Sequence, residues 1–391
     1  MANYLDSRKG KEEKPVVAIC YDFDKTLSPN NMQAQGYIQS VGFDVTDEFW
    51  EKSNALATDN EMDQNLAYMY LMIAEADGRI VVNKKNLIDY GAKVELFPGV
   101  EEWFDRINAY GNDRGVIVEH YIISSGLKEM IEGTTLAKKK VFEKIYASSF
   151  FYSEKGSAIW PAQVVNYTNK TQFLFRIEKG TLDINDPGVN ESFEEDEIRV
   201  PFRNMIYIGD SDTDIPCMKL VNFYGGHSIA VYNPDTKDKS LAYKMMREKR
   251  IKYFASADYS EGKELDLLVK SIIDRTAYNE RLENIHYTHM NEQRKNDASQ
   301  SKEDREKIEL IIALEKSHNY ATTHMIVSQI CKINTWTQSE KEELFKIALD
   351  NSQVKGVLRD VDVKAVFLNL IDKVKTQSTY AKKIKEIISA K

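Results

Sequence analysis

Two short acidic strings in the chain have the residue types to bind a metal ion and to act in acid-base chemistry. Asp22 and Asp24 lie two residues apart in the string DFDKTL, and Asp210 and Asp214 lie in the string GDSDTD. Two carboxylates spaced like the first pair can converge on one metal and one substrate, while different surroundings separate a nucleophile from a general acid or base. The acidic residues of the second string offer the hard oxygen ligands that Mg²⁺ prefers.

Each string directly follows an apolar, β-branched run that predicts a strand buried on both faces. The first run is 16–21 and the second is 205–208, with further runs at 116–123 and 228–232. Either string alone also suits a turn capped by an aspartate. Because open α/β sheets place their active sites at the carboxyl ends of the strands, the two strings together favour a site at that edge.

Helix-like periodic segments separate these runs, and the pattern predicts an α/β fold: a Rossmann-like parallel sheet with helices on both faces. The stretch 30–95 is too long for one crossover helix and predicts an inserted α-helical subdomain. A helix is expected from Glu101 to Tyr110 with Gly111 as its stop signal, a β-hairpin within 146–167, and an exposed loop over 182–200. From about residue 275 proline disappears and apolar residues recur at helical spacing, which predicts an all-helical C-terminal domain.

With these strings in place, the chain resembles the haloacid dehalogenase (HAD) superfamily, whose four motifs lie at strand ends of such a core. The first motif matches Asp22, Asp24 and Thr26, and the fourth matches Asp210 and Asp214. The second, a Ser or Thr after an apolar strand, matches Ser124 in Ser124-Ser125-Gly126. The third is a lysine before or within a helix. Lys170 fits it better than Lys179, because Lys170 stands where a helix begins.

The resemblance covers about residues 15 to 274 and implies a Mg²⁺-dependent phosphatase. Asp22 would attack phosphorus and Asp24 would act as acid and base; Asp22, Asp24 and Asp210, with Asp214, would hold the metal. Ser124 and Ser125 would bind the phosphoryl oxygens and Lys170 would balance charge. The corresponding domains are a core of 15–29 and 96–274, a helical cap of 30–95, and a C-terminal domain of 275–391 with no assigned role.

The substrate expected from the resemblance is a small phosphorylated metabolite that side chains of the cap recognise. Five cap-side residues stand where they can touch it, although each is more often ordinary surface: Asn30, Asn31, Gln33, Tyr37 and Trp50. Two alternatives stay open. One is a phosphotransferase with the same aspartyl-phosphate, and the other is a binding or scaffold protein whose phosphatase site is vestigial.

Composition narrows the class of protein further. Of the 391 residues 42% are hydrophobic and 29% charged, which is typical of a globular protein of two or three domains. The 53 Lys and Arg against 61 Asp and Glu give a formal charge of -8, which argues against a nucleic-acid partner. Three widely spaced cysteines and the lack of an apolar run long enough for a signal peptide or a membrane span predict a cytoplasmic protein without membrane contact.

Overall fold

The computed structural model describes residues 8–193, 197–297, 302–373 and 378–389. The chain divides into two compact units, Met1–Val189 with Arg199–Tyr278, and Asn190–Ile198 with Asn279–Lys391. Within the described residues, no helix combines the length and the apolar character that crossing a membrane requires.

The first unit is built on a seven-stranded sheet of order β4-β3-β2-β1-β5-β6-β7, in which only the β3–β4 pair is antiparallel. This confirms the α/β class and the four strands expected from apolar runs. The expected hairpin is also present, as β3 and β4, although β3 is a member of the parallel sheet as well. The short strand β7 was not predicted. The strands are β1 (Val16–Tyr21), β2 (Ile117–Leu127), β3 (Lys144–Tyr152), β4 (Ala158–Gln163), β5 (Met205–Gly209), β6 (His227–Tyr232) and β7 (Tyr253–Ser256).

The alternation of side chains along β1 organises the two layers that cover the sheet. Val17, Ile19 and Tyr21 point into one apolar cluster, and the residues between them point into the other. The first cluster is completed by α5, α6 and the beginning of α11, and the second by α8, α9 and α10. Every residue of β1 is at most 1% exposed. The helices of these layers are α5 (Val100–Asp113), α6 (Lys128–Gly133), α7 (Thr135–Lys138), α8 (Thr171–Lys179), α9 (Ile215–Phe223), α10 (Ser240–Arg247) and α11 (Glu264–Asp297).

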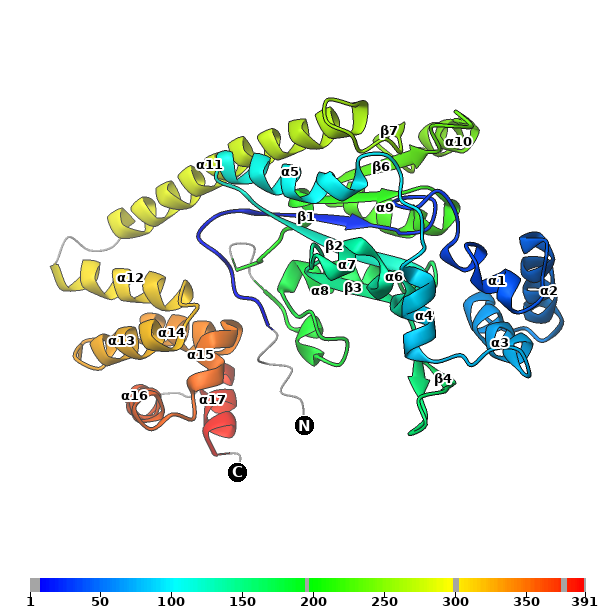
Figure 1. Cartoon of the computed structure of the whole chain (residues 1–391). Helices are drawn as coiled ribbons and strands as arrows, with labels where there is room; N and C mark the ends of the chain where they lie inside the picture. The colour runs from blue at the N-terminus through cyan, green and yellow to red at the C-terminus, as the bar shows by residue number, and fades with distance from the viewer. Residues whose placement is uncertain (1–7, 194–196, 298–301, 374–377, 390–391) are drawn as a thin grey trace. The chain divides into compact units, whose positions relative to one another are not determined.

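The stretch after β1 is helical, as expected. In Figure 1 the helices α1, α2 and α3 form a group beside the carboxyl end of β1, whereas α4 lies against α6 of the sheet layer. The four helices are α1 (Tyr37–Ser40), α2 (Thr46–Asp59), α3 (Gln64–Ala76) and α4 (Lys84–Gly91).

One boundary predicted from the sequence was wrong. Helix α5 does not stop at Gly111 but continues to Asp113. At Gly111 a Cβ atom would lie 2.5 Å from Val118 Cγ2 and 3.1 Å from the Val116 carbonyl oxygen. This glycine therefore serves close packing of the helix on the sheet rather than helix termination.

The loop expected to be exposed over 182–200 is partly buried in its described residues, 182–193 and 197–200; residues 194–196 lie outside the described part. The Arg176 guanidinium donates to the carbonyl oxygens of Asp183, Ile184 and Asp186, which turns the chain around one buried cation. The Asp186 carboxylate is buried as well and accepts from Arg8 at 2.7 Å. Arginine side chains thus donate the hydrogen bonds that water would otherwise supply to these carbonyl and carboxylate oxygens.

The second unit is all helical in its described residues, which confirms the expected tail. Thr337 and Glu340 form a capping box at the start of a helix, since Thr337 Oγ1 accepts from the Glu340 amide and Glu340 Oε2 accepts from the Thr337 amide. The helices that follow α11 are α12 (Lys302–Glu315), α13 (Tyr320–Ile330), α14 (Gln338–Asp350), α15 (Ser352–Val357), α16 (Val361–Asp372) and α17 (Thr379–Ser389).

A buried ion network ties the N-terminal segment to the sheet. Glu119 on β2 accepts from Arg199 at 2.6 and 2.9 Å, from Lys9 Nζ at 2.6 Å and from the Tyr121 hydroxyl at 2.6 Å. Burial alone would raise the pKa of Glu119, but these donors, Arg199 above all, lower it to about 2. Glu119 therefore stays ionised inside the protein down to strongly acidic pH.

The Glu119 network makes the first unit sensitive to acid in a defined window. Because the folded pKa of about 2 lies below the unfolded value of 4.5, the stabilisation is complete above pH 4.5 and is lost as the pH falls toward 2. We expect Glu119→Gln to lower the free energy of unfolding at pH 7 by about 3 kcal/mol. The difference from wild type should shrink between pH 5 and pH 2 in denaturant titrations.

The exposed Glu102 on α5 provides the control for this prediction, because Glu102→Gln should change stability by less than about 0.5 kcal/mol. A Glu119→Gln deficit that stayed constant from pH 7 to pH 2 would contradict the network's role.

Candidate active site

The sheet order brings the acidic strings to one place. Strand β1 pairs in parallel with β2 on one side and with β5 on the other, so the chain reverses its direction of winding at β1. Asp22 directly follows β1, Asp210 directly follows β5, and Ser124 lies in the last part of β2. Ligands of open α/β sheets bind at such a reversal point, outside the carboxyl ends of the strands.

Three carboxylates converge there. One oxygen from each of Asp22, Asp210 and Asp214 lies within 4.8 Å of the others. Asp214, at the end of the short 3-10 turn η5 (Asp212–Asp214), is held close because Gly209 has no side chain. A Cβ at that position would lie 2.4 Å from Asp214 Oδ2.

The Asp214 carboxylate is engaged on both oxygens. Its Oδ1 accepts from the Tyr207 hydroxyl at 2.9 Å and from Lys170 at 2.8 Å. Its Oδ2 accepts from the amides of Asp210 and Ser211 at 3.2 and 3.3 Å. These bonds fix the loop that carries Asp210, so Asp214 acts on the site mainly by orienting its neighbours.

Lys170 is the cation that the structure brings to these carboxylates. It precedes α8, is fully buried, and places Nζ 2.8 Å from Asp214 Oδ1 and 3.2 Å from Asp22 Oδ1. Burial would lower the pKa of Lys170, but the carboxylates of Asp214 and Asp22 outweigh it, and the pKa lies above its ordinary value. Lys179, at the other end of α8, instead donates to the Val189 carbonyl oxygen at 2.7 Å.

The aspartates of the first string differ in their surroundings. Burial raises the pKa of Asp22 to about 6, against the opposing effect of Lys170. Burial and the adjacent Asp22 carboxylate raise the pKa of Asp24 further, to about 8. Asp24 Oδ1 accepts from the Met32 amide at 2.8 Å, which fixes the carboxyl group in place. At neutral pH the two groups are therefore suited to different tasks, Asp22 as a carboxylate and Asp24 as a carboxylic acid.

Burial also raises the pKa of Asp210, together with repulsion from the carboxylates of Asp214 and Asp22. The three carboxyl groups of Asp22, Asp210 and Asp214 outnumber the one lysine beside them, Lys170, which leaves an excess of negative charge when they are ionised. That excess is what a divalent cation would neutralise.

The serine pair after β2 faces the same space. Ser124 is 1% exposed, and its Oγ accepts from the Gly126 amide at 3.1 Å, which tightens the turn. The Ser125 carbonyl oxygen accepts from the Tyr68 hydroxyl of α3 at 2.7 Å. This hydrogen bond joins the helical group after β1 to the edge of the sheet.

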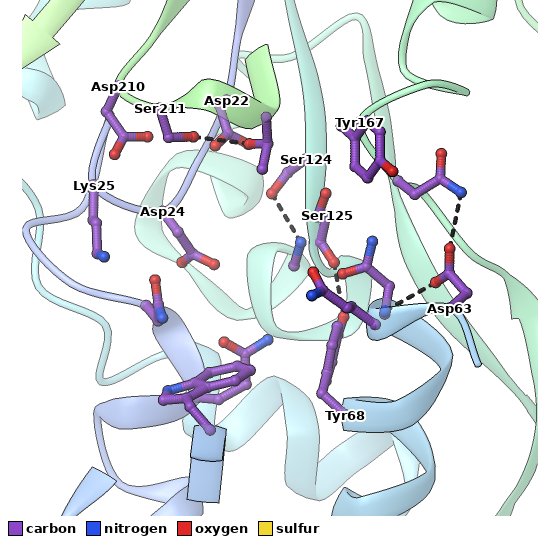
Figure 2. Close-up of a pocket in the computed structure, with 18 of the residues that line it drawn as sticks. Asp22, Asp24, Lys25, Asp63, Tyr68, Ser124, Ser125, Tyr167, Asp210 and Ser211 are labelled. Atoms are coloured by element: carbon purple, nitrogen blue, oxygen red, sulfur yellow. Dashed lines mark hydrogen bonds between the residues drawn. The ribbon is translucent and has the colours of Figure 1, made fainter. Parts of the chain in front are cut away.

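A cavity of about 560 Å³ opens between these elements, and Asp22, Asp24, Ser124, Ser125 and Asp210 all line it. Figure 2 shows these acidic residues and Lys25 on one side of the cavity, with Asp63, Tyr68 and Tyr167 on the other. Lys170 and Asp214 lie behind the carboxylates rather than in the lining. The site residues expected from the sequence are thus brought together, although their roles stay proposals.

Other lining residues were only partly foreseen. Of the five cap-side candidates, Asn31, Gln33 and Trp50 line the cavity, whereas Asn30 and Tyr37 do not. The Tyr37 hydroxyl donates to the Met72 carbonyl oxygen inside the helical group. Sequence reasoning missed Asp63, Asn65, Tyr68, Asn166 and Tyr167, which also line the cavity.

One of these missed residues, Asp63, does have a weak signal in the sequence. Asp63 is an N-cap whose Oδ1 accepts from the amides of Asn65 and Leu66, as expected for an aspartate just before a helix. Its Oδ2 accepts from Asn166 Nδ2 at 3.0 Å. That long-range contact, which fixes α3 beside the cavity, has no local signature.

Comparison with known proteins gives similarities at low identity. No family model matches the chain. An uncharacterized protein of Borreliella burgdorferi (strain ATCC 35210 / DSM 4680 / CIP 102532 / B31) is 28% identical over 285 residues, which is 65% of this chain and 95% of that protein.

Among solved structures, the chain is similar to a HAD family hydrolase from Salmonella enterica subsp. enterica serovar Typhi. The identity is 18%, the TM-score is 0.44, and the match covers 67% of this chain and 73% of that one. A phosphoserine phosphatase with a phospho-aspartyl intermediate analogue is 14% identical with a TM-score of 0.40, covering 66% and 99%. Cytosolic 5'-nucleotidase IIIB bound to cytidine is 14% identical with a TM-score of 0.40, covering 66% and 86%. None of these similarities assigns an activity to this chain.

The contrast between the two lysines of α8 yields a stability prediction. Lys170→Met removes the cation between two buried carboxylates and should lower the free energy of unfolding by about 3–5 kcal/mol at pH 7. Lys179→Met removes the hydrogen bond to the Val189 carbonyl oxygen at a partly exposed position and should cost less than about 1.5 kcal/mol. Denaturant titrations followed by circular dichroism measure both, and equal losses for the two variants would refute the assignment of Lys170 to the site.

Proposed function

We propose that the chain is a Mg²⁺-dependent phosphomonoester hydrolase of the HAD superfamily that acts through an aspartyl-phosphate on Asp22. The observation that carries this proposal is the convergence of Asp22, Asp210 and Lys170 from three separate elements, with Asp24 beside them. The intact set counts against a vestigial site in a scaffold protein.

The donor set fits a divalent metal ion. Asp22 Oδ1 is buried without a hydrogen-bond partner among the described residues, and its neighbour is the Lys170 ammonium at 3.2 Å. Carboxylate oxygens of Asp22 and Asp210, with the Asp24 backbone carbonyl, are the hard ligands that suit Mg²⁺. We assign Asp214 to the support of this set, because both of its oxygens already accept hydrogen bonds. The ion would neutralise the repulsion between the Asp22 carboxylate and an anionic phosphate ester.

The first step forms the bond from Asp22 to phosphorus and breaks the bond from phosphorus to the leaving oxygen. Asp24, protonated at neutral pH because its pKa is about 8, donates its proton to that oxygen. In the second step Asp24 takes a proton from water as the water oxygen attacks phosphorus, and the bond to Asp22 breaks.

The remaining residues stabilise the charge that moves in these steps. We assign the Ser124 hydroxyl and the Ser125 amide, both in the cavity lining, to hydrogen bonds with the phosphoryl oxygens, and Lys170 to keeping the Asp22 carboxylate ionised. We assign residues 30–95 to a cap that covers the phosphoryl group, with 15–29 and 96–274 as the core and 275–391 as an added domain. The Tyr68 to Ser125 hydrogen bond supports the assignment of a covering role to α3, because it holds that helix against the site.

Replacing the proposed nucleophile gives the direct test. Asp22→Asn keeps the shape but not the charge, and should reduce hydrolysis of p-nitrophenyl phosphate at least about 1,000-fold, with an unchanged circular dichroism spectrum. Asp212→Asn is the control in the neighbouring acidic string, since Asp212 is exposed and pairs with Lys244.

The Asp212→Asn variant should stay within about three-fold of wild type. Full activity of Asp22→Asn would rule out the mechanism. Phosphate release that falls when glycerol is added, with glycerol phosphate formed instead, would favour a phosphotransferase.

The metal requirement has an activity readout and a binding readout. EDTA should abolish turnover and Mg²⁺ should restore it. In the absence of substrate, Mg²⁺ should raise the unfolding temperature of wild type, because it binds only the folded site, and should have a smaller effect on Asp210→Asn. Metal-independent turnover would overturn the role given to Asp210.

A further inference from the structure

Among the described residues, a buried amide side chain of the cavity lining has a carbonyl oxygen that the fold does not use. Gln33 is 1% exposed and lines the cavity, and its Oε1 atom has no hydrogen-bond partner among the described residues. A buried acceptor without a donor is costly, and such groups are rare in native proteins unless a ligand or water completes them.

Gln35, two residues further along the same segment, shows the ordinary case. Its Nε2 donates to Ser28 Oγ at 2.8 Å and its Oε1 accepts from the Glu95 amide at 2.8 Å, so the fold itself uses both ends of the amide. Gln35 does not line the cavity. The acceptor without a partner therefore belongs to the glutamine that lines the cavity, whereas the glutamine outside the lining is fully paired.

Two other amide side chains of the cavity lining, Asn65 and Asn166, donate hydrogen bonds to the protein itself. Asn65 Nδ2 donates to the Val165 carbonyl oxygen at 3.0 Å, and Asn166 Nδ2 donates to Asp63 Oδ2 at 3.0 Å. Gln33 is thus the buried amide whose carbonyl is left for a ligand.

The charges of the lining exclude an anionic leaving group. Within the described part of the chain, Lys25 is the one cation of the lining, against the carboxyl groups of Asp22, Asp24, Asp63 and Asp210. Figure 2 shows Lys25 beside Asp24 and Asp210, at the end where the phosphoryl group reacts. A carboxylate or second phosphate elsewhere in the cavity would find no cation to compensate its desolvation.

An ammonium group is also poorly matched. Asp63 is the carboxylate on the side away from the catalytic aspartates, and both of its oxygens already accept hydrogen bonds, from Asn65, Leu66 and Asn166. Amide and hydroxyl groups supply most of the remaining polar lining, and these groups pair well with alcohols, which both donate and accept.

The cavity wall also offers an aromatic surface. Trp50 and Tyr68 both line the cavity, with ring centroids 5.8 Å apart in an edge-to-face arrangement. Such a surface packs against the C–H groups of a carbohydrate or polyol while its hydroxyls reach the amides. The cavity of about 560 Å³ is large enough for a six-carbon chain with its phosphate.

We infer that the leaving group is a neutral, hydroxyl-rich alcohol of the sugar or polyol class, with a hydroxyl donating to Gln33 Oε1. This inference rests on the proposed hydrolase function and names the substrate class of that site. Gln33 is then a specificity-determining residue on the leaving-group side.

The test compares four phosphate esters with the full chain and Mg²⁺: sorbitol 6-phosphate, 3-phosphoglycerate, phosphoethanolamine and p-nitrophenyl phosphate. Wild type should hydrolyse sorbitol 6-phosphate with a kcat/KM at least about ten-fold above the carboxylate and ammonium esters. Gln33→Leu should lower the ratio of kcat/KM for sorbitol 6-phosphate over p-nitrophenyl phosphate about ten-fold, mainly through KM, because one hydrogen bond is lost.

Gln172→Leu, at an exposed position on α8 outside the cavity, is the matched control and should leave that ratio unchanged. The ligand-free Gln33→Leu protein should unfold at the same temperature as wild type or higher, since the variant removes a buried acceptor without a donor. This stability readout separates a residue kept for a ligand from one kept for the fold.

Three results overturn the inference while leaving the hydrolase in place. The first is 3-phosphoglycerate or phosphoethanolamine as the best substrate, and the second is a Gln33→Leu ratio of kcat/KM values equal to that of wild type. The third is a lower unfolding temperature of Gln33→Leu together with equal losses of activity on all esters. Wild-type protein that hydrolyses none of the four esters, p-nitrophenyl phosphate included, overturns the proposed function and this inference with it.

Discussion

The site depends on a single buried cation, the ammonium group of Lys170. Asp22 and Asp214 come from loops that follow two neighbouring strands, and two carboxylates this close in a buried place repel each other. Lys170 Nζ, 2.8 Å from one and 3.2 Å from the other, turns that repulsion into attraction and holds the ends of β1 and β5 together. The arrangement is asymmetric, because Asp214 is saturated with hydrogen bonds whereas Asp22 keeps an oxygen free of them. The ion pairs of Lys170 thus stabilise the fold through Asp214 and leave an oxygen of Asp22, the proposed nucleophile, without a hydrogen bond.

The parts of this arrangement that the sequence predicts are those governed by local pattern. Asp22, Asp24 and Asp210 were predicted because each follows a strand whose burial on both faces gives an apolar run in the sequence, whereas Ser124 was predicted from the resemblance to the HAD motifs. Strand β7 was not predicted because it is short and half-buried at the edge of the sheet, so its sequence contains no continuous apolar run. Gly111 was misread because a glycine required for close packing looks the same in sequence as one that ends a helix.

The choice between Lys170 and Lys179 illustrates the limit of local pattern more sharply. The two residues lie at opposite ends of one helix, and only the packing of α8 against the sheet decides which one reaches Asp22, 148 positions earlier in the chain. On the cap side of the cavity, too, packing between distant segments decides which residues reach the site. Tyr68 and Asp63 owe their places to the contacts with Ser125 and Asn166, which join segments 57 and 103 positions apart. Such contacts have no periodicity to detect, so three-dimensional structure alone reveals them.

The sheet ends in a strand that is poorly suited to bind another strand. β4 has only six residues, it pairs with β3 alone, and Pro161 within it has no N–H group to donate. Trp160 beside it is 70% exposed, so the edge is apolar enough to attract another chain. The short length and the proline deprive an incoming strand of a regular hydrogen-bond ladder. The consequence is protection against aggregation: this edge can stay exposed in a crowded solution without seeding intermolecular β-structure.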